Sequence, residues 1–367
     1  MLKLVVLLGL SLAVNALDIP ATDSRIYHTE HNWYADPSGF LETINSGAYL
    51  KVRFNGSSFK LNLDDSFNQV NCTLAWSVDD GPEQSIFMPV TSNSITIASN
   101  LNKDAIHSLY LFVKNQLSPD CWYNPITRLR IMNVTIDDDA TLFAPKLASK
   151  RLLVYGDSIT EGTNINGMLP KQLANDAHLT WAFALALALD AELSVVAFGG
   201  QGYTKAGAGN SPQLWNSSGL SHESAWKWLS VDHDRTFATC PDYILNEHGG
   251  NDYDQDQNQV YINSLGWLRD MRKVCPQSHI FFTIPFGQFC EATLTKVYQD
   301  YQTGNPDPLT HLIQMGEQVS TGLRSRKPTF ECADGVHPRA WKSSQIGAVL
   351  AVKIVSLLNK GYTIMEM

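Results

Sequence analysis

Between about residues 19 and 141, short runs of alternating apolar and polar residues follow one another, with turn residues between them. In one such run, Leu50, Val52 and Phe54 are separated by single polar residues, which places every second side chain on the same face of a strand. Evenly spaced strands without helical periodicity predict a β-sandwich. Further strands are predicted at residues 59–63, 74–78, 94–98, 108–113 and 129–136.

Turn residues stand between these strands. The pair Asn55-Gly56 lies between the runs 50–54 and 59–63, and Asn-Gly readily adopts the positive φ angles of a tight turn. This pair therefore predicts a β-hairpin between the two strands.

From about residue 150, compact apolar runs alternate with segments long enough to form helices. Such alternation predicts a parallel sheet covered by helices on both faces. The chain is therefore expected to hold a β-sandwich domain at residues 17–145 and an α/β domain at residues 150–362. In the second domain, strands are predicted at residues 152–155, 193–198, 243–246 and 280–284, and helices at residues 180–191, 257–274, 309–324 and 343–359.

The first 16 residues have the pattern of a secretory signal peptide. Lys3 gives a basic start, residues 4–14 are mostly apolar, and Val14-Asn15-Ala16 has the small residues of a cleavage site. The apolar run is shorter than the roughly 20 residues that span a bilayer, which argues against a membrane anchor. We therefore expect cleavage after Ala16 and secretion of the remaining chain.

The cysteines are interpreted in the light of that signal. An even number, six, in a secreted chain favours disulfides, and the absence of Cys-x-x-Cys or zinc-finger spacing argues against a metal site. Cys72 and Cys121 are the two cysteines of the predicted sandwich, so we expect them to pair. The other four allow three arrangements, of which we favour Cys240–Cys275 with Cys290–Cys332.

The overall charge excludes some classes of binding partner. Lys and Arg number 27 against 36 Asp and Glu, which gives a net charge of −9 without a basic stripe. Neither nucleic acid nor a membrane surface is therefore expected as a partner, and no obligate protein partner is evident. Four Asn-x-Ser/Thr sequons predict a glycoprotein, in agreement with secretion. They begin at Asn55, Asn71, Asn133 and Asn216.

Four polar or glycine-rich blocks follow predicted strands or lie late in the α/β domain, at residues 156–162, 199–202, 248–252 and 334–338. Parallel sheets gather their sites in the loops at the carboxyl ends of the strands. Ser158 in the first block is a candidate nucleophile, which needs a base and an oxyanion hole. Asp334 precedes His337 by three residues, a spacing that lets a carboxylate orient an imidazole. Each block alone is an ordinary turn, but their conjunction indicates a serine hydrolase.

These blocks resemble those of the SGNH (GDSL-type) hydrolases over about residues 150–360. The resemblance implies a flavodoxin-like parallel sheet, with Ser158 as nucleophile, His337 as base and Asp334 as the group that orients the base. It also implies three oxyanion donors, the backbone N–H groups of Ser158 and Gly200 and the side chain of Asn251. The Gly-x-Ser-x-Gly elbow of ordinary α/β-hydrolases is absent.

Residues 47–57 and 61–65 resemble the jelly-roll-like module that precedes the SGNH domain in carbohydrate esterase family two. Members of that family remove acetyl groups from plant polysaccharides and sugars, and some lack the acidic residue of the triad. Asp334 places this chain with the triad version. The resemblance implies a carboxylic ester hydrolase that acts on acetylated carbohydrate and needs no metal or organic cofactor.

Several aromatic residues could stack on a sugar ring. Trp341 lies four residues after His337, and Tyr203 follows the Gly200 turn, so these two are predicted to bind substrate. The remaining candidates are Trp215, Trp226, Trp228 and Tyr253.

Two alternatives to a secreted O-acetyl esterase with an acyl-enzyme on Ser158 stay open. A lipid or small-ester hydrolase would call for a long apolar groove, whereas residues 163–167 after the nucleophile are rather polar. A non-catalytic sugar-binding protein would have no use for the catalytic residues, yet Ser158, His337 and Asp334 are all present.

Overall fold

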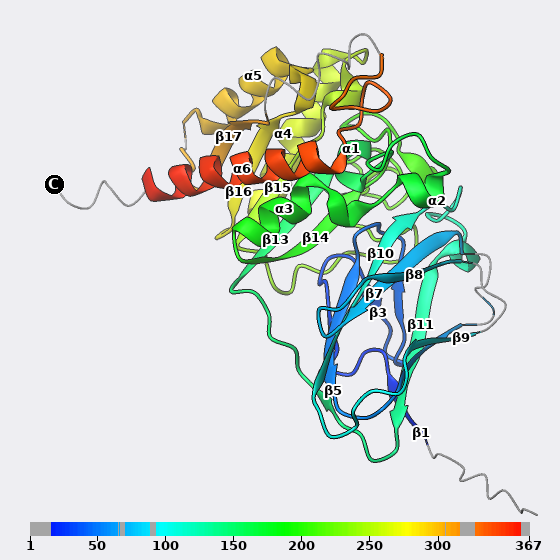
Figure 1. Cartoon of the computed structure of the whole chain (residues 1–367). Coiled ribbons are helices and arrows are strands. Elements are labelled where there is room, and N and C mark those ends of the chain that lie inside the picture. Colours follow the sequence, from blue (N-terminus) through cyan, green and yellow to red (C-terminus); the bar gives the residue numbers. More distant parts are fainter. Residues whose placement is uncertain are drawn as a thin grey trace, which may run out of the picture.

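The computed structural model describes residues 16–64, 66, 70–88, 93–304, 306–315 and 327–360. All but the last residue of the predicted signal peptide lie outside these ranges. Within them, Figure 1 shows an all-β part formed by the first half of the chain and a part of mixed strands and helices formed by the second half.

The all-β part consists of two antiparallel sheets that pack against each other (Figure 1). One sheet has the order β3 (Tyr34–Ala35), β4 (Leu41–Thr43), β11 (Leu129–Asp137), β6 (Phe59–Leu63) and β9 (Ser94–Ala98), with β1 (Ala16–Pro20) also on β11. The other has the order β12 (Leu142–Phe143), β5 (Tyr49–Phe54), β10 (His107–Gln116), β7 (Cys72–Val78) and β8 (Gln84–Phe87), with β2 (Tyr27–His28) on β5. Leu61 and Ile131 of the first sheet share one hydrophobic core with Val52 and Leu111 of the second.

The predicted hairpin at Asn55-Gly56 is wrong. β5 and β6 belong to different sheets, so the turn carries the chain from one sheet to the facing one. Phe54 and Phe59 on either side of the turn both enter the core, where their ring centroids lie 4.9 Å apart. Burial of both rings between the sheets therefore decides the path of the chain, which a local turn signal cannot indicate.

The second half forms a five-stranded sheet in which every neighbouring pair is parallel, as predicted. Its order is β14 (Ala191–Ala197), β13 (Lys150–Gly156), β15 (Tyr243–Asn246), β16 (His279–Ile284) and β17 (Thr310–Gln314). In chain order this is 2-1-3-4-5, the flavodoxin-like arrangement. The order reverses at β13, the strand that runs into Ser158.

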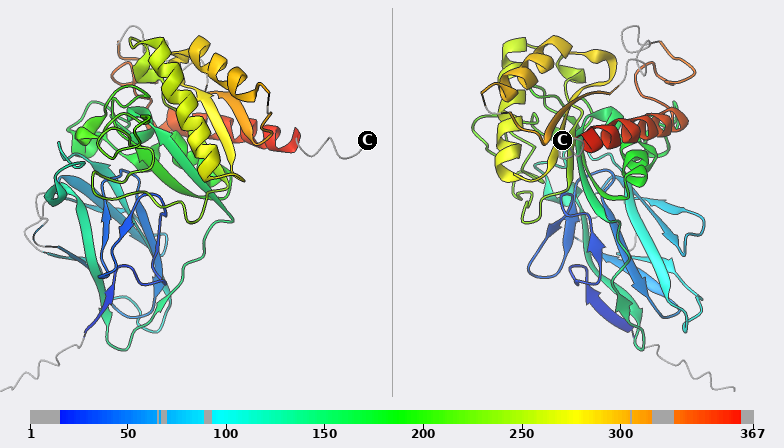
Figure 2. Two further views of the ribbon diagram at one scale, coloured as in Figure 1. Left: turned by 180° about the vertical axis from the view of Figure 1, so that it is seen from behind. Right: turned by 90° about the vertical axis from the view of Figure 1, so that its left-hand side faces the viewer.

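Helices cover both faces of this sheet (Figure 2). α3 (Trp181–Ala188) and α6 (Ala340–Lys360) pack on one face, and α4 (Gln257–Val274) and α5 (Glu291–Gln302) on the other. By length and composition, α6 is the one described helix that could cross a membrane. Its buried residues, including Leu350 and Ile354, pack against the sheet and α3.

The helix predicted at residues 309–324 is wrong where the structure describes it. Residues Thr310–Gln314 form the edge strand β17, which pairs with β16. The prediction also missed α5, although its buried residues Leu294 and Val297 are three positions apart, a helical spacing.

Of the three predicted disulfides, only Cys240–Cys275 is formed, with Cα atoms 5.5 Å apart. Cys72 and Cys121 do not pair because Cys72 lies in the sandwich core, whereas Cys121 packs with residues of the α/β part. Cys290 and Cys332 do not pair either. They pack in hydrophobic clusters on different faces of the parallel sheet.

Candidate active site

The nucleophile candidate lies where β13 gives way to a short helix, α1 (Ser158–Glu161). Asp157 caps this helix, since its Oδ1 accepts a hydrogen bond of 2.9 Å from the N–H of Ile159. Gly162 ends it with a φ of +86°, and a Cβ there would lie 2.3 Å from the carbonyl oxygen of Asp176. Capping at both ends holds Ser158 at the carboxyl edge of the sheet.

Ser158, His337 and Asp334 form a continuous hydrogen-bonded chain. His337 Nε2 is 2.9 Å from Ser158 Oγ, and His337 Nδ1 is 2.6 Å from Asp334 Oδ2. The structure thus brings these three predicted site residues together in the order that a serine triad requires.

Several donors hold the Asp334 carboxylate in place. Its Oδ1 accepts hydrogen bonds from the N–H groups of Val336 and His337, and its Oδ2 accepts one of 2.7 Å from Asn164 Nδ2. Partial burial by itself would raise the pKa of Asp334, but the bonds from His337 and Asn164 hold that pKa well below its ordinary value. A carboxylate that stays ionised can orient the imidazole and stabilise its protonated form. Sequence reasoning missed Asn164.

Two backbone N–H groups are available beside the serine. In the part of the chain that the structure describes, neither the N–H of Ser158 nor that of Gly200 donates an internal hydrogen bond. Gly200 follows β14 with a φ of +78°, a conformation that favours glycine. A Cβ added at the preceding Gly199 would lie 3.7 Å from that of Ser158, so this turn passes close to the nucleophile.

The third predicted oxyanion donor, Asn251, lies in a short 3₁₀ helix, η5 (Gly250–Asp252), after β15. Its Nδ2 donates to Asp157 Oδ2 at 2.8 Å and to the carbonyl oxygen of Gln201 at 3.0 Å. The amide therefore ties the loop after β13 to the loop after β14. With both amide hydrogens engaged, Asn251 must give up one of these bonds in order to donate to an oxyanion.

A buried carboxyl pair beneath the serine was not predicted. Glu247 is 1% exposed, and its Oε2 accepts a hydrogen bond of 3.1 Å from the Thr160 hydroxyl and one of 3.4 Å from the N–H of Asp157. Burial, and the neighbouring Asp157, raise the pKa of Glu247 well above its ordinary value, and burial also raises that of Asp157. The signal in the sequence was a charged residue directly after the apolar strand β15.

A cavity of about 470 Å³ opens beside Ser158 and His337. The α/β part contributes Gly200, Glu161 and Lys171 to its lining, among other residues. The sandwich contributes Gln116, Leu117, Ser118, Pro119 and Cys121. The cavity is therefore formed by both parts of the molecule.

The two aromatic residues predicted to bind sugar, Trp341 and Tyr203, differ in their exposure to solvent. Trp341 is the second residue of α6 and is 46% exposed, and its ring centroid lies 5.4 Å from that of Phe330, which is 82% exposed. Tyr203 is fully buried in the core, so the prediction that it contacts substrate is wrong. Its N–H donates to Asp252 instead, at 2.8 Å. Of the other candidates, Trp215 and Trp226 are buried, Trp228 is half-buried and Tyr253 is exposed.

The chain is similar to known carbohydrate esterases. An acetylxylan esterase / glucomannan deacetylase from Cellvibrio japonicus is 27% identical over 258 residues, which are 67% of this chain and 65% of that protein. The structure of a family two carbohydrate esterase from the same organism superposes with a TM-score of 0.74 at 17% identity, covering 94% of this chain and 98% of that one. One from Clostridium thermocellum in complex with cellohexaose gives a TM-score of 0.70 at 16% identity, covering 91% and 99%. No protein-family model matches the chain.

Proposed function

We propose that this protein is a secreted serine esterase that removes O-acetyl groups from carbohydrate. The observation that carries the proposal is the hydrogen-bonded chain Ser158–His337–Asp334 beside a cavity. The relatives are carboxylic ester hydrolases, and their fold, including a β module before the parallel sheet, extends over nearly all of this chain. We infer that this module is jelly-roll-like, as in the predicted family.

In the first half of the reaction, Ser158 Oγ attacks the acetyl carbonyl carbon while His337 Nε2 takes the serine proton. The negative charge that develops on the carbonyl oxygen faces the N–H groups of Ser158 and Gly200, and Asn251 becomes a third donor when its amide gives up the bond to Asp157 or Gln201. The carbon–oxygen bond to the sugar then breaks, and the sugar hydroxyl leaves with the proton from His337. The product is an acetyl-enzyme.

In the second half, a water molecule attacks the acetyl-enzyme and gives its proton to His337. The tetrahedral intermediate collapses, His337 returns the proton to Ser158 Oγ, and acetic acid leaves and ionises to acetate in water. Asp334 stays ionised throughout, in keeping with its lowered pKa, and stabilises the protonated imidazole. Every proton in the cycle is thus carried by a group of this chain or by water.

The lining of the cavity favours a sugar over a lipid. Glu161, Lys171 and Asn175 are polar, and Gly199 and Gly200 bring backbone close to the serine. An acyl chain would need a continuous apolar groove, whereas sugar hydroxyls can bond to such polar groups. The exposed pair Trp341 and Phe330 offers further apolar surface for a pyranose ring.

Acetate release from acetylated xylan, acetylated glucomannan and simple sugar acetates tests the proposal. We expect release from at least one of these and a strong preference for acetyl over octanoyl in a series of nitrophenyl esters. A preference for octanoate would favour the lipid or small-ester hydrolase. Failure of a serine-directed phosphonate to label Ser158 would favour a non-catalytic sugar-binding protein.

Secretion is a separate part of the proposal and needs its own test. The signal peptide predicted at residues 1–16 supports it, as do the sequons. Expression in a eukaryotic secretory host, with mass spectrometry of the medium, should give a mature chain that begins at Leu17. Retention of the whole chain in the cell would contradict it.

A further inference from the structure

One wall of the cavity at Ser158 is built by the sandwich. Strand β10 ends at Gln116, and the next five residues, together with Gln116, form a segment that we name the sandwich wall, residues 116–121. Within it, Pro119 is exposed and Leu117 is half-buried, whereas Gln116 and Ser118 are buried. The wall therefore presents mainly apolar side-chain surface to whatever occupies the cavity.

We propose that Arg128 is a positioning residue that holds the sandwich wall in place, and that Leu117 and Pro119 on this wall select the alcohol part of the substrate. The inference rests on the proposed function, because it takes that alcohol to be a sugar. Ser158, His337 and Gly200 already account for the reacting ester, so the wall is left to contact the rest of the substrate. The apolar C–H face of a pyranose ring fits such a surface.

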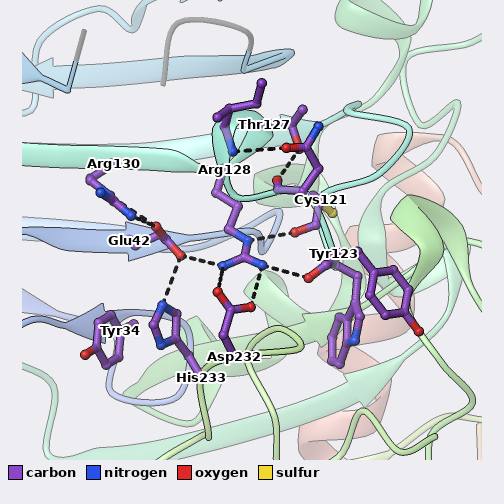
Figure 3. Close-up of polar contacts among 12 residues, drawn as sticks. Tyr34, Glu42, Cys121, Tyr123, Thr127, Arg128, Arg130, Asp232 and His233 are labelled. Carbon is purple, nitrogen blue, oxygen red and sulfur yellow. Dashed lines mark hydrogen bonds and ion pairs between the residues drawn. The ribbon is translucent and has the colours of Figure 1, made fainter. Parts of the chain in front are cut away.

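Arg128 is completely buried, and all five of its side-chain N–H groups are used (Figure 3). Nε donates to the carbonyl oxygen of Cys121 at 3.0 Å, and Nη2 donates to that of Trp122 at 2.8 Å. These two bonds fix the end of the sandwich wall. The guanidinium is rigid and planar, so it fixes their direction as well as their length.

The other bonds of Arg128 reach two distant parts of the chain. Nη1 and Nη2 form a fork to the carboxylate of Asp232, in the α/β part, at 3.0 and 2.8 Å. Nη1 also donates to Glu42 on β4 at 3.1 Å. Figure 3 shows the guanidinium beside both carboxylates. Arg128 therefore fixes the position of the wall relative to both the sandwich and the α/β part.

Bonds between the wall and Thr127 make the wall stiff. The Ser118 hydroxyl donates to the carbonyl oxygen of Thr127 at 3.1 Å, and the Thr127 hydroxyl donates to that of Asp120 at 2.6 Å. Next to the wall, the Trp122 N–H donates to the carbonyl oxygen of Gly209, which also lines the cavity. A wall tied at so many points cannot adapt to a substrate of another shape, so it selects by exclusion.

Arg130 supplies a matched control. It also binds Glu42, through Nη2 at 2.7 Å, and it binds Asp64 at 3.3 Å, whereas the guanidinium that donates to the carbonyl oxygens of Cys121 and Trp122 is that of Arg128. Arg128→Lys and Arg130→Lys therefore both weaken a buried ion pair with Glu42, and only the first releases the carbonyl oxygens of Cys121 and Trp122. Both variants should lose stability, because a buried carboxylate is left poorly paired in each.

The experiment compares the wild type with Arg128→Lys, Arg130→Lys, Asp232→Asn and Pro119→Ala. It measures KM and kcat for a sugar acetate and for 4-nitrophenyl acetate, together with the rate of phosphonylation of Ser158. We expect Arg128→Lys, Asp232→Asn and Pro119→Ala to raise KM for the sugar acetate about tenfold, while nitrophenyl acetate and phosphonylation change less than about twofold. Arg130→Lys should match the wild type on all three measurements.

Two results would overturn the inference. In the first, Arg128→Lys and Arg130→Lys behave alike, and each loses activity toward both substrates in proportion to its loss of stability. That result would make Arg128 a structural residue only. The other is an unchanged KM in Asp232→Asn and Pro119→Ala, which decide the matter if Arg128→Lys does not fold. A wild type that is phosphonylated at Ser158 but cleaves no sugar acetate would instead contradict the proposed function.

Discussion

The loops that hold Ser158, Gly200 and His337, which we name the catalytic loops, and the sandwich wall line the same cavity, but they are built in different ways. In the loops, the contacts that orient the catalytic groups include several between near neighbours, such as Asp334 with His337 and Asp157 with Ile159, although His337 reaches Ser158 across 179 residues. The wall is held by Arg128, which bonds to Asp232, 104 residues away, and to Glu42, 86 residues away. The reaction is thus encoded in short segments at the ends of parallel strands, whereas the shape of the cavity depends on contacts across the whole chain.

This contrast predicts two kinds of variant. Changes in the loops should reduce the turnover of every ester without loss of stability. Changes in the wall or the exposed aromatics should act on sugar esters alone.

Replacing the nucleophile should have the largest effect. Ser158→Ala should reduce kcat/KM at least about 10³-fold for sugar acetates and nitrophenyl acetate alike, because only the oxyanion hole and substrate binding remain. Ser158 is only partly buried at the start of α1, so thermal unfolding should be unchanged. Wild-type-like hydrolysis by this variant would end the mechanism.

The same contrast explains how far the sequence alone could lead. The strands at 59–63 and 94–98 and the helix at 257–274 were predicted with the observed bounds, because side-chain periodicity reports on burial along one element. The site residues were found from short spacings within four blocks. Ser158 and His337 are 179 residues apart in the sequence. The parallel topology brings them together because both lie in loops at the carboxyl edge of the sheet.

The features that the sequence could not reveal depend on contacts between residues that lie far apart in the sequence. The turn at Asn55-Gly56 has the local pattern of a hairpin, yet it joins two sheets. Cys121 lies within the sandwich part of the sequence but packs with residues of the α/β part. Assigning the cysteines to domains by sequence position therefore predicted a wrong pair, Cys72–Cys121. Arg128 has no local pattern at all, since its role depends on carboxylates from two other segments.

Removal of the Asn251 amide should come second in size. We expect Asn251→Ala to lower kcat about 10²- to 10³-fold for both ester types, because it removes a predicted oxyanion donor and the tie between Asp157 and the Gln201 loop. KM should change little, since the amide acts mainly in the transition state. Asn258→Ala, at an exposed position near the start of α4, is the control and should behave like the wild type. A normal kcat in Asn251→Ala would reduce Asn251 to a turn residue.

Glu161 should make stability depend on pH. Burial, with the charge of Asp157 nearby, raises the pKa of Glu161 from 4.5 to about 7. Between these two values the folded protein keeps a proton that the unfolded chain has lost, so this group makes stability fall as pH rises from about 4.5 to 7. Below that window the group has no effect, and above it the loss is constant.

Glu161→Gln removes the titration and keeps the shape of the side chain. Denaturant midpoints measured from pH 4 to 8 should therefore fall less steeply with pH in the variant than in the wild type. The comparison must be a difference between the two proteins, because burial also raises the pKa of Asp157 and Glu247 in both. Identical slopes would mean that Glu161 ionises normally in the folded protein.

The smallest expected effect concerns Trp341. Its ring is 46% exposed and packs beside the exposed Phe330, so truncation removes little buried surface. If the ring stacks on the sugar, Trp341→Ala should raise KM for sugar acetates about fivefold, which corresponds to roughly 1 kcal/mol of aromatic stacking. Nitrophenyl acetate should be unaffected, because its small alcohol part does not need the platform. Phe330→Ala should show a weaker effect in the same direction, since it only supports the edge of the Trp341 ring. Loss of stability together with both activities would show instead that Trp341 anchors the start of α6. The aromatic pair would then belong with the framework of the α/β part, and the sandwich wall would be left as the main selector of the sugar.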